Sequence, residues 1–219
     1  MKKIVIIIAA ILALMGCSKE PALQLNTEDV VMYSLDEHLI TSNGTNVSFA
    51  SENPYIASVN ETTGKVTGMH IGETYINVVA DQGSAKVKVT IKAKYHTITD
   101  PYINWGASRS DVLEKVNLAP DFEDDYEISY IYGDANYGDP HIVTSYLFKS
   151  GVALRSVIVF INNDYYAEAV LHLAERFQYI GEKQGVIVFA DAIEDKDTKT
   201  LISISKQSGQ YVIIYSQRD

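Results

Sequence analysis

The chain has 219 residues, of which 47% are hydrophobic and 21% charged, and its formal net charge is −10 at pH 7. This length allows one or two domains, and the hydrophobic content is enough for a packed core. The acidic balance argues against nucleic acid as a partner and against electrostatic adsorption to anionic lipid, because both require basic surfaces.

The first 17 residues have the layout of a secretory signal. Lys2 and Lys3 precede an unbroken apolar stretch, residues 4–15, which is followed by Gly16 and by Cys17, the one cysteine of the chain. A basic segment, an apolar segment and a small residue before a cleavage point define such a signal. As a helix the apolar stretch would be about 18 Å long, whereas crossing a bilayer takes ~20 residues. A permanent transmembrane helix is therefore not expected.

The run Leu14-Met15-Gly16-Cys17 resembles the lipobox of bacterial lipoproteins. The resemblance implies that the Cys17 thiol receives a diacylglyceryl group, that residues 1–16 are removed as a signal peptide, and that residues 17–21 form a lipidated tether. Two or more acyl chains give stable membrane anchoring. We therefore expect a membrane-anchored protein of the cell envelope, held in the outer membrane of a Gram-negative bacterium on either the periplasmic or the surface-exposed face.

Residues 22–93 read as an all-β module. Polar and apolar residues alternate over 45–51, 74–78 and 85–91, and turn signals separate these segments. In the last segment Val87, Val89 and Ile91 share one face, while Lys86 and Lys88 share the other. One face against a core and one in water is typical of an antiparallel sheet, and several short strands at this spacing indicate a β-sandwich.

The spacing within this module resembles the group 2 bacterial immunoglobulin-like domain of invasin- and intimin-type adhesins. The pattern is Phe49-x-Ser51-x-Asn53-x-x-Ile56-Ala57-x-Val59, then Gly64-Lys65-Val66-Thr67-Gly68 and Gly72-Glu73-Thr74-Tyr75-Ile76. Phe49 stands where the family often has Trp. The resemblance implies a rigid spacer or display unit without catalytic residues, some members of which bind glycans or proteins. The residues predicted to form its core are Phe49, Val59, Val66, Ile76 and Val89.

Residues 94–104 carry no clear period and read as a linker, and residues 105–219 read as an α+β domain, so the chain is expected to be multidomain. Ser108 is a predicted helix N-cap, with Asp111 favouring the positive helix end. Three strands (126–132, 142–149, 152–161), a second helix from residue 163 and three more strands (185–190, 200–205, 210–216) follow. The repeated order predicts a duplicated helix-plus-three-strand unit. It is similar to duplicated folds of the β-lactamase-inhibitor-protein type, which include small outer-membrane assembly lipoproteins.

The second predicted helix has apolar residues at helical spacing. They are Ala167, Val170, Leu171, Ala174 and Phe177. These residues are predicted to face the sheet, and His172 is predicted to face solvent.

Signatures of catalysis are missing from the sequence. It contains no His-Glu-x-x-His, no Gly-x-Ser-x-Gly and no phosphate-binding Gly-x-x-x-x-Gly-Lys. The run from Asp134 to Asp139 has oxygen-bearing side chains at alternate positions, but Ser145 stands where a calcium loop needs its closing Glu. We therefore predict no enzyme activity, no cofactor and no metal site.

Aromatic residues gather in the first half of the α+β domain. Trp105, Tyr102, Tyr132 and Tyr137 are the candidate ligand-binding residues, because flat rings with polar tips stack on sugars or hold a protein loop. Tyr126, Tyr130 and Tyr132 have the same parity in one predicted strand, so they are expected to point the same way. The alternative is that the strand tyrosines pack under the helices.

These features favour a non-enzymatic envelope lipoprotein, in which an Ig-like stalk presents the distal domain for protein or glycan binding. The alternative is a periplasm-facing lipoprotein that assists envelope assembly or inhibits an enzyme. A hydrolase without a recognisable signature is a third reading, which nothing in the sequence supports.

Overall fold

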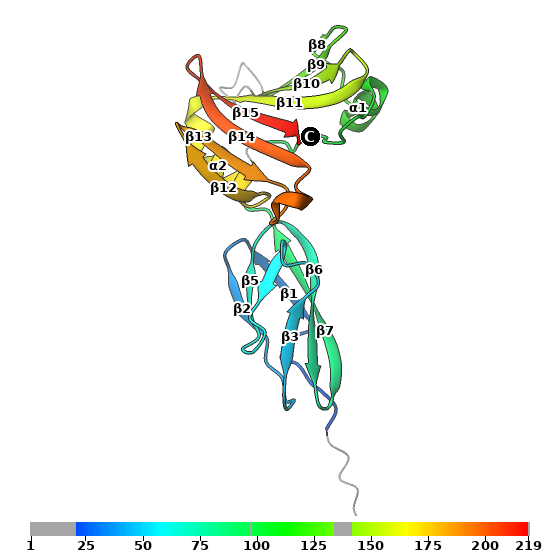
Figure 1. Ribbon diagram of the computed structural model, residues 1–219, viewed down its shortest axis with the longest axis vertical. Coiled ribbons are helices and arrows are strands. Elements are labelled where there is room, and N and C mark those ends of the chain that lie inside the picture. Colours follow the sequence, from blue (N-terminus) through cyan, green and yellow to red (C-terminus); the bar gives the residue numbers. More distant parts are fainter. Residues whose placement is uncertain (1–20, 97, 134–141, 219) are drawn as a thin grey trace, which may run out of the picture.

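A computed structural model describes residues 21–96, 98–133 and 142–218. The chain forms two domains stacked end to end, with the β-sandwich at one end and the larger α+β domain at the other (Figure 1). The described chain starts at the end of the sandwich that lies away from the α+β domain.

The N-terminal domain is a sandwich of two sheets. The four-stranded sheet has the order β1-β7-β6-β3 and the three-stranded sheet the order β2-β5-β4. The strands are β1 (Asp29–Tyr33), β2 (Glu37–Leu39), β3 (Ser48–Ser51), β4 (Ala57–Val59), β5 (Lys65–Gly68), β6 (Gly72–Ala80) and β7 (Gly83–Lys92).

The predicted core of this domain is confirmed. Phe49, Val66, Ile76 and Val89 are at most 5% exposed, and the half-buried Val59 packs against them. Along β7 the burial alternates as the sequence predicts, with Val87, Val89 and Ile91 buried and the lysines outside. This alternation follows from the two-residue period of a strand that has one face on a core.

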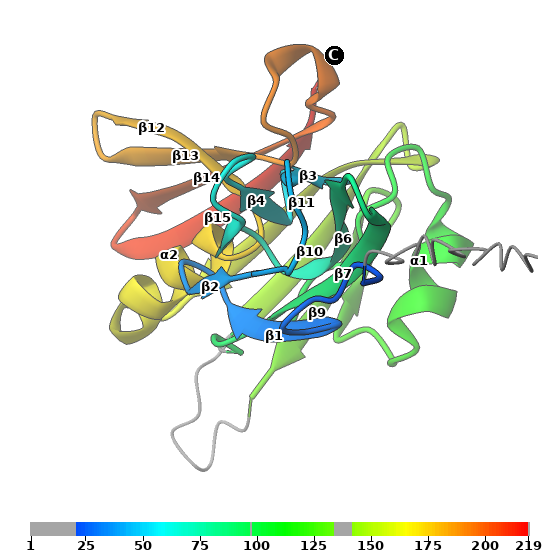
Figure 2. The ribbon, with the colours of Figure 1, turned by 90° about the horizontal axis from the view of Figure 1, so that it is seen from below.

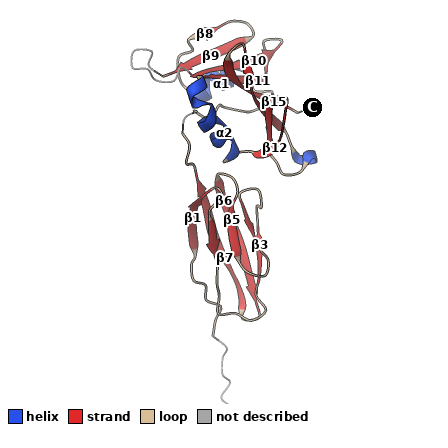
Figure 3. Cartoon of the chain, turned by 90° about the vertical axis from the view of Figure 1, so that its left-hand side faces the viewer, coloured by secondary structure: helices blue, strands red, loops and turns tan. Residues whose placement is uncertain are grey.

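The C-terminal domain is built on one eight-stranded sheet with the order β12-β13-β14-β15-β11-β10-β9-β8. Helices α1 and α2 both lie on the same side of this sheet (Figure 3). The elements are α1 (Arg109–Val116), β8 (Phe122–Glu123), β9 (Glu127–Tyr132), β10 (Ile142–Lys149), β11 (Ala153–Ile161), α2 (Tyr166–Ala174), β12 (Gln178–Lys183), β13 (Val186–Ala190), β14 (Thr200–Gln207) and β15 (Gln210–Gln217), with short 3-10 turns at Asn163–Tyr165 and Asp195–Asp197.

The predicted pattern of a helix followed by three strands is not confirmed, because four strands follow each helix. The six predicted strands are present, and the two additional ones, β8 and β12, form the outer edges of the sheet. Read outward from the centre, the order is β11, β10, β9, β8 on one side and β15, β14, β13, β12 on the other. The two halves are therefore arranged symmetrically about the β11–β15 pair.

Local sequence signals explain several of these elements. Ser108 and Asp111 form the capping box that opens α1, and Asn117 ends the helix in a left-handed conformation with φ 52°. The predicted Ser-Gly turns are also present, since Ser150-Gly151 and Ser208-Gly209 have positive φ at both residues. That geometry is required for the tight turns that join antiparallel strands, and glycine adopts it without strain.

The predicted orientation of α2 is correct for Val170, Ala174 and Phe177, which pack on the core, and wrong for Leu171 and His172. Its buried residues are Ala169, His172 and Leu173, whereas Leu171 is 44% exposed. His172 is fully buried, with Nδ1 3.3 Å from the Tyr95 carbonyl oxygen and Nε2 3.0 Å from the Asp100 carboxylate. Hydrogen-bond partners that are distant in the sequence thus allow His172 to be buried, although the pattern of the helix alone predicts that it is exposed to solvent.

The two domains are joined by hydrogen bonds at the C-terminal end of α2. The Glu175 carboxylate, on a residue 3% exposed, accepts the backbone N–H groups of Lys94 and Tyr95 at 2.9 and 3.1 Å. The Glu175 carbonyl accepts the N–H of Ile71 from the sandwich at 2.8 Å. The Tyr55 hydroxyl donates to the Arg176 carbonyl at 2.8 Å. The α2 terminus therefore bonds to the sandwich and to the connecting segment at once.

Candidate functional site

The candidate aromatic residues that the structure describes are packing residues. Trp105 is half-buried against the core of the C-terminal domain, and its Nε1–H donates to Thr200 Oγ1 at 3.0 Å. The backbone N–H of Tyr102 donates to the Tyr146 hydroxyl at 3.1 Å, and Tyr132 packs half-buried on the same core. These contacts fasten the segment before α1 to the sheet. Tyr137 and Cys17 lie outside the described residues.

The strand tyrosines follow the packing alternative. Tyr130 and Tyr146 are each 1% exposed and meet edge to face, with ring centroids 6.0 Å apart. Burial raises the pKa of Tyr146 to about 12. Tyr126 lies before β9 and is 62% exposed, so the expected common orientation with Tyr130 is not found.

The face of the large sheet opposite the two helices carries few charged side chains, and Glu127, which pairs with Leu147 at the start of β9, is one of them. Strand register places serines and apolar residues on it in alternation, and none of them belongs to either hydrophobic core. We call it the open face. Its residues are Glu127, Ser129, Ile131, Val143, Ser145, Leu147, Ser156, Ile158, Phe160, Val188, Leu201, Ser203, Ser205, Val212, Ile214 and Ser216.

Hydrogen bonds within the sheet satisfy many of the hydroxyl groups on the open face. Ser129 and Ser145 bond to each other at 2.8 Å, Ser156 donates to the Tyr215 carbonyl at 3.1 Å, and Ser216 donates to the Leu201 carbonyl at 3.3 Å. Because these groups need no water to be satisfied, covering the open face costs little desolvation free energy. The centres of protein interfaces are likewise depleted of charge.

One end of the open face is cationic. The β10–β11 pairing shifts register between Leu147 and Phe148, which leaves Arg155 as an extra residue in a bulge. Bulges re-aim side chains in this way. Arg155 and Lys149 line a cavity of ≈ 310 Å³ together with Ser156 and Ser216 from the open face. The surface thus joins a centre of serine and aliphatic side chains to a margin that carries Lys149 and Arg155, with Glu127 at the same end.

Two searches of the described residues concern metal ligands and membrane-spanning helices. Among residues 21–96, 98–133 and 142–218, no group of three His, Cys, Asp or Glu side chains is placed to hold a metal ion. No described helix is long and apolar enough to span a membrane.

The open face has a signal in the sequence, a recurrence of serines between core residues, which is separate from the clustered aromatic residues. Ser203 and Ser205 alternate with the core residues Ile202 and Ile204, and Ser156 precedes the core residue Val157. Small hydroxyl residues recurring on the outer face of several predicted strands, with few charges among them, indicate a surface that is not purely solvated.

Comparison with known proteins gives one family match. Residues 31–91 match the bacterial Ig-like domain (group 2). No curated protein matches the chain.

Solved structures similar to the chain are remote. Domains 4–9 of the surface layer protein SbsC align with 91% of the chain at 11% identity and a TM-score of 0.28, and the chain spans 27% of that structure. Domains 5–6 of the S-layer protein SbsC align at 12% identity and a TM-score of 0.30, covering 90% of the chain and 84% of the structure. Human protocadherin-24 EC1-2 aligns at 11% identity and a TM-score of 0.27, covering 89% and 93%. At these scores the likeness does not bear on function. What is established is that residues 31–91 form a bacterial Ig-like domain of group 2.

Proposed function

We propose that this chain is a non-enzymatic protein of the bacterial cell envelope that binds another protein through the open face. The Ig-like domain acts as the stalk, and the C-terminal domain carries the recognition surface. The observation that supports this most directly is the open face, whose centre is uncharged, which spans six neighbouring strands and which neither helix covers.

A protein partner is favoured over a glycan. The glycan hypothesis rested on exposed aromatic rings, yet Trp105 is bonded to Thr200 and Tyr102 and Tyr132 pack on the core. The open face offers aliphatic and hydroxyl groups instead, with cations at one end. These features fit a partner surface that is uncharged at its centre and acidic where it meets Lys149 and Arg155.

Lipid anchoring through Cys17 is part of the proposal and is supported by the signal and lipobox pattern of residues 2–17. The described chain starts at the end of the sandwich away from the C-terminal domain, so an anchor at this terminus would leave the open face on the far side of the stalk (Figure 1). The symmetric order of the large sheet also suits the alternative of a periplasm-facing assembly protein or inhibitor. The surface-exposed binder and the periplasm-facing protein would both use the open face. They differ in the side of the membrane that the protein occupies.

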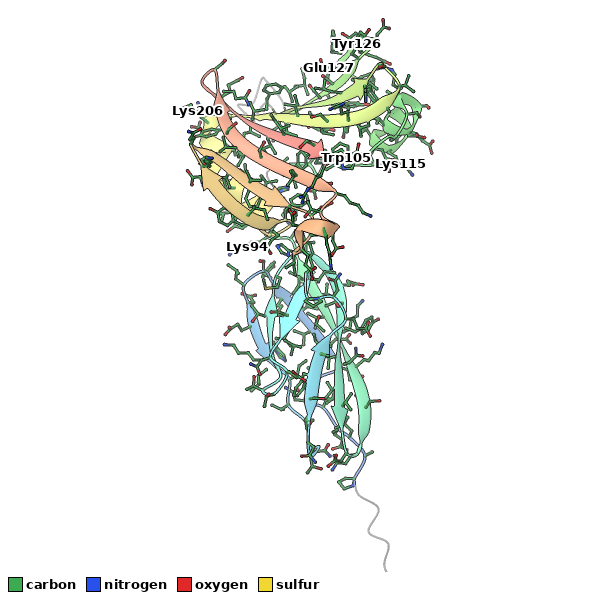
Figure 4. The ribbon with its side chains drawn as sticks, viewed as in Figure 1. Lys94, Trp105, Lys115, Tyr126, Glu127 and Lys206 are labelled. Atoms are coloured by element: carbon green, nitrogen blue, oxygen red, sulfur yellow. The ribbon has the colours of Figure 1, made fainter. Side chains whose placement is uncertain are left out.

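Site-specific photocrosslinking in intact cells tests the open face. A benzophenone amino acid at Ser203, in the middle of the face, should give a discrete protein adduct. The same group at Lys115, exposed on α1 on the helix side, should not (Figure 4). Ser205→Arg should abolish the Ser203 adduct without lowering the amount of folded protein. Equal adducts at both positions, or none at Ser203, would refute the assignment.

Two cell-fractionation measurements test the envelope part of the proposal. Cys17→Ser should move the protein from the membrane fraction to the soluble fraction. Protease added to intact cells should cleave the chain if it occupies the outer surface, and complete protection would favour the periplasmic alternative.

A further inference from the structure

A groove lies at the junction of the two domains, beside the hydrogen bonds of Glu175 with Lys94 and Tyr95. Its volume is ≈ 420 Å³. The sandwich contributes Tyr33, Leu35 and Met69, and the C-terminal domain contributes Leu171, Phe177 and Tyr179. Clefts with mostly apolar walls at domain junctions are common binding sites.

Several groove residues expose large apolar surfaces to water. Leu35 is 79% exposed, Tyr179 53%, and Tyr33 and Leu171 44% each. Leu171 is the residue that the sequence placed against the core and that the actual orientation of α2 turns outward. Exposed apolar side chains that gather in one place on a soluble domain indicate an interaction site.

The two charged side chains in the groove, Glu175 and Lys94, differ in whether a partner can pair with them. The Glu175 carboxylate accepts two backbone N–H groups and the Arg176 guanidinium at 2.6 Å, so its charge is compensated within the protein. Lys94 is exposed at the waist between the domains, with Nζ over the Tyr95 ring at 5.9 Å, and no described carboxylate forms an ion pair with it (Figure 4). The groove therefore offers a positive charge beside apolar walls.

Two sheet edges border the groove. β1 is an outer strand of the four-stranded sheet and ends at Tyr33, and β12 is an outer strand of the eight-stranded sheet and begins at Gln178. The β12–β13 hairpin projects beyond the outline of the sandwich, which leaves its edge accessible (Figure 2). An outer strand carries unpaired backbone N–H and C=O groups, which an added strand can use.

We propose that this groove binds an extended segment of a partner protein, with aliphatic side chains along it and an acidic side chain opposite Lys94. The apolar walls take the aliphatic groups, Lys94 pairs with the acid, and the edges of β1 and β12 bond to the backbone. The site is independent of the open face, because it uses neither the strands at the centre of the large sheet nor its cationic margin.

The test uses two matched ten-residue peptides of alternating threonine and valine, one with a central aspartate and one with a central lysine. They are titrated into the isotopically labelled chain from Ser18 onward, which contains every described element, and amide shifts are followed by NMR. The aspartate peptide should shift amides around Leu171 and Tyr179 with a Kd on the order of 100 μM, and the lysine peptide should bind at least about tenfold more weakly.

Variants decide whether the groove is responsible. Leu171→Ser should weaken the aspartate peptide about tenfold, whereas Leu118→Ser, at a leucine 54% exposed elsewhere in the same domain, should leave it unchanged. Lys94→Glu should reverse the preference between the two peptides. Equal affinities for the peptides, no saturable binding up to about 1 mM, or equal effects of the two leucine variants would overturn the proposal. So would a concentration-dependent dimer that buries the groove, since the occupant would then be a second copy.

Discussion

Replacing Glu175 by alanine should loosen the junction between the domains. The change removes the acceptor of two backbone N–H groups, those of Lys94 and Tyr95. It also removes one acceptor of the Arg176 guanidinium, which keeps its hydrogen bonds to Asp100 and to the His172 carbonyl and is therefore given no cost. A buried donor left without a partner costs about 1–3 kcal/mol. Lys94 is exposed and water can replace its partner, so we assign about 1 kcal/mol to it and about 2 kcal/mol to the half-buried Tyr95. The expected loss in the free energy of unfolding is therefore about 3 kcal/mol.

The fluorescence of Trp105, the one tryptophan of the chain, reports this loss in urea unfolding of the C-terminal domain. Glu175→Gln keeps one acceptor oxygen and should lose about half as much, whereas Glu114→Ala, exposed on α1, should stay within about 0.5 kcal/mol of the wild type. Residual dipolar couplings should fit one alignment for both wild-type domains and separate alignments in Glu175→Ala. A loss no larger than that of Glu114→Ala, with a single alignment retained, would refute the assigned role of Glu175.

Three further predictions concern single residues. Gly64 (φ +72°) and Gly185 (φ +76°) share a backbone conformation, but a Cβ at Gly64 would lie 2.7 Å from the Phe49 ring, whereas one at Gly185 meets nothing within 4 Å. Calorimetry should therefore show Gly185→Ala losing about 1–2 kcal/mol and Gly64→Ala clearly more, and equal losses would contradict this. Trp105→Ala should lower the free energy of unfolding by about 2 kcal/mol, somewhat below the cost of emptying a fully buried site. A loss of ligand binding at unchanged stability would instead revive the aromatic hypothesis. His70 is stacked on Tyr55, and burial lowers the pKa of its imidazole. Its hydrogen bonds to backbone groups act in the other direction but are the weaker effect. As the pH falls, His70 therefore takes up a proton in the unfolded chain before it does so in the folded protein. The contribution of His70 to the free energy of unfolding is complete above about pH 6.5 and should fall as the pH drops toward the folded-state pKa. His70→Phe should flatten this dependence of stability on pH in urea titrations at pH 5 to 7.

Lowering the pH should also affect the junction between the two domains through the protonation of Asp100. Burial alone would raise the pKa of this carboxyl, but hydrogen bonds from His172 and Arg176 outweigh it and hold the pKa below its ordinary value. The contribution of Asp100 is therefore present above about pH 4 and is lost as the pH falls further. Asp100→Asn should remove this low-pH component while leaving the His70 component in place.

The sequence predicts elements that depend on neighbours along the chain. The alternation in β7, the capping box of α1 and the Ser-Gly turns all follow from residues within a few positions of one another. β8 was missed because it is two residues long. β12 was missed because Gly181, which sits at a register shift in its pairing with β13, interrupts the pattern.

The errors concern residues whose partners are distant in the sequence. His172 meets Asp100 from 72 positions away, and Trp105 meets Thr200 from 95 positions away. In α2 the hydrophobic pattern identifies Val170 and Ala174 as packing residues, but it does not show that the buried side extends to His172 and leaves Leu171 exposed. The open face emerges only when strand order is known, because its serines come from five different strands.

The position of β15 has a consequence for the order in which the domains fold as the chain is made. It follows every other strand in the sequence, yet it lies in the middle of the large sheet and pairs with β14 on one side and β11 on the other. A chain that emerges from its amino end can complete the Ig-like sandwich early. It cannot join the halves of the large sheet until residues 210–217 arrive, because the β11–β15 contact closes a long loop of chain. During that interval the exposed edges of β11 and β14 are open to wrong pairing, so the emerging chain is most vulnerable to aggregation before residues 210–217 are available.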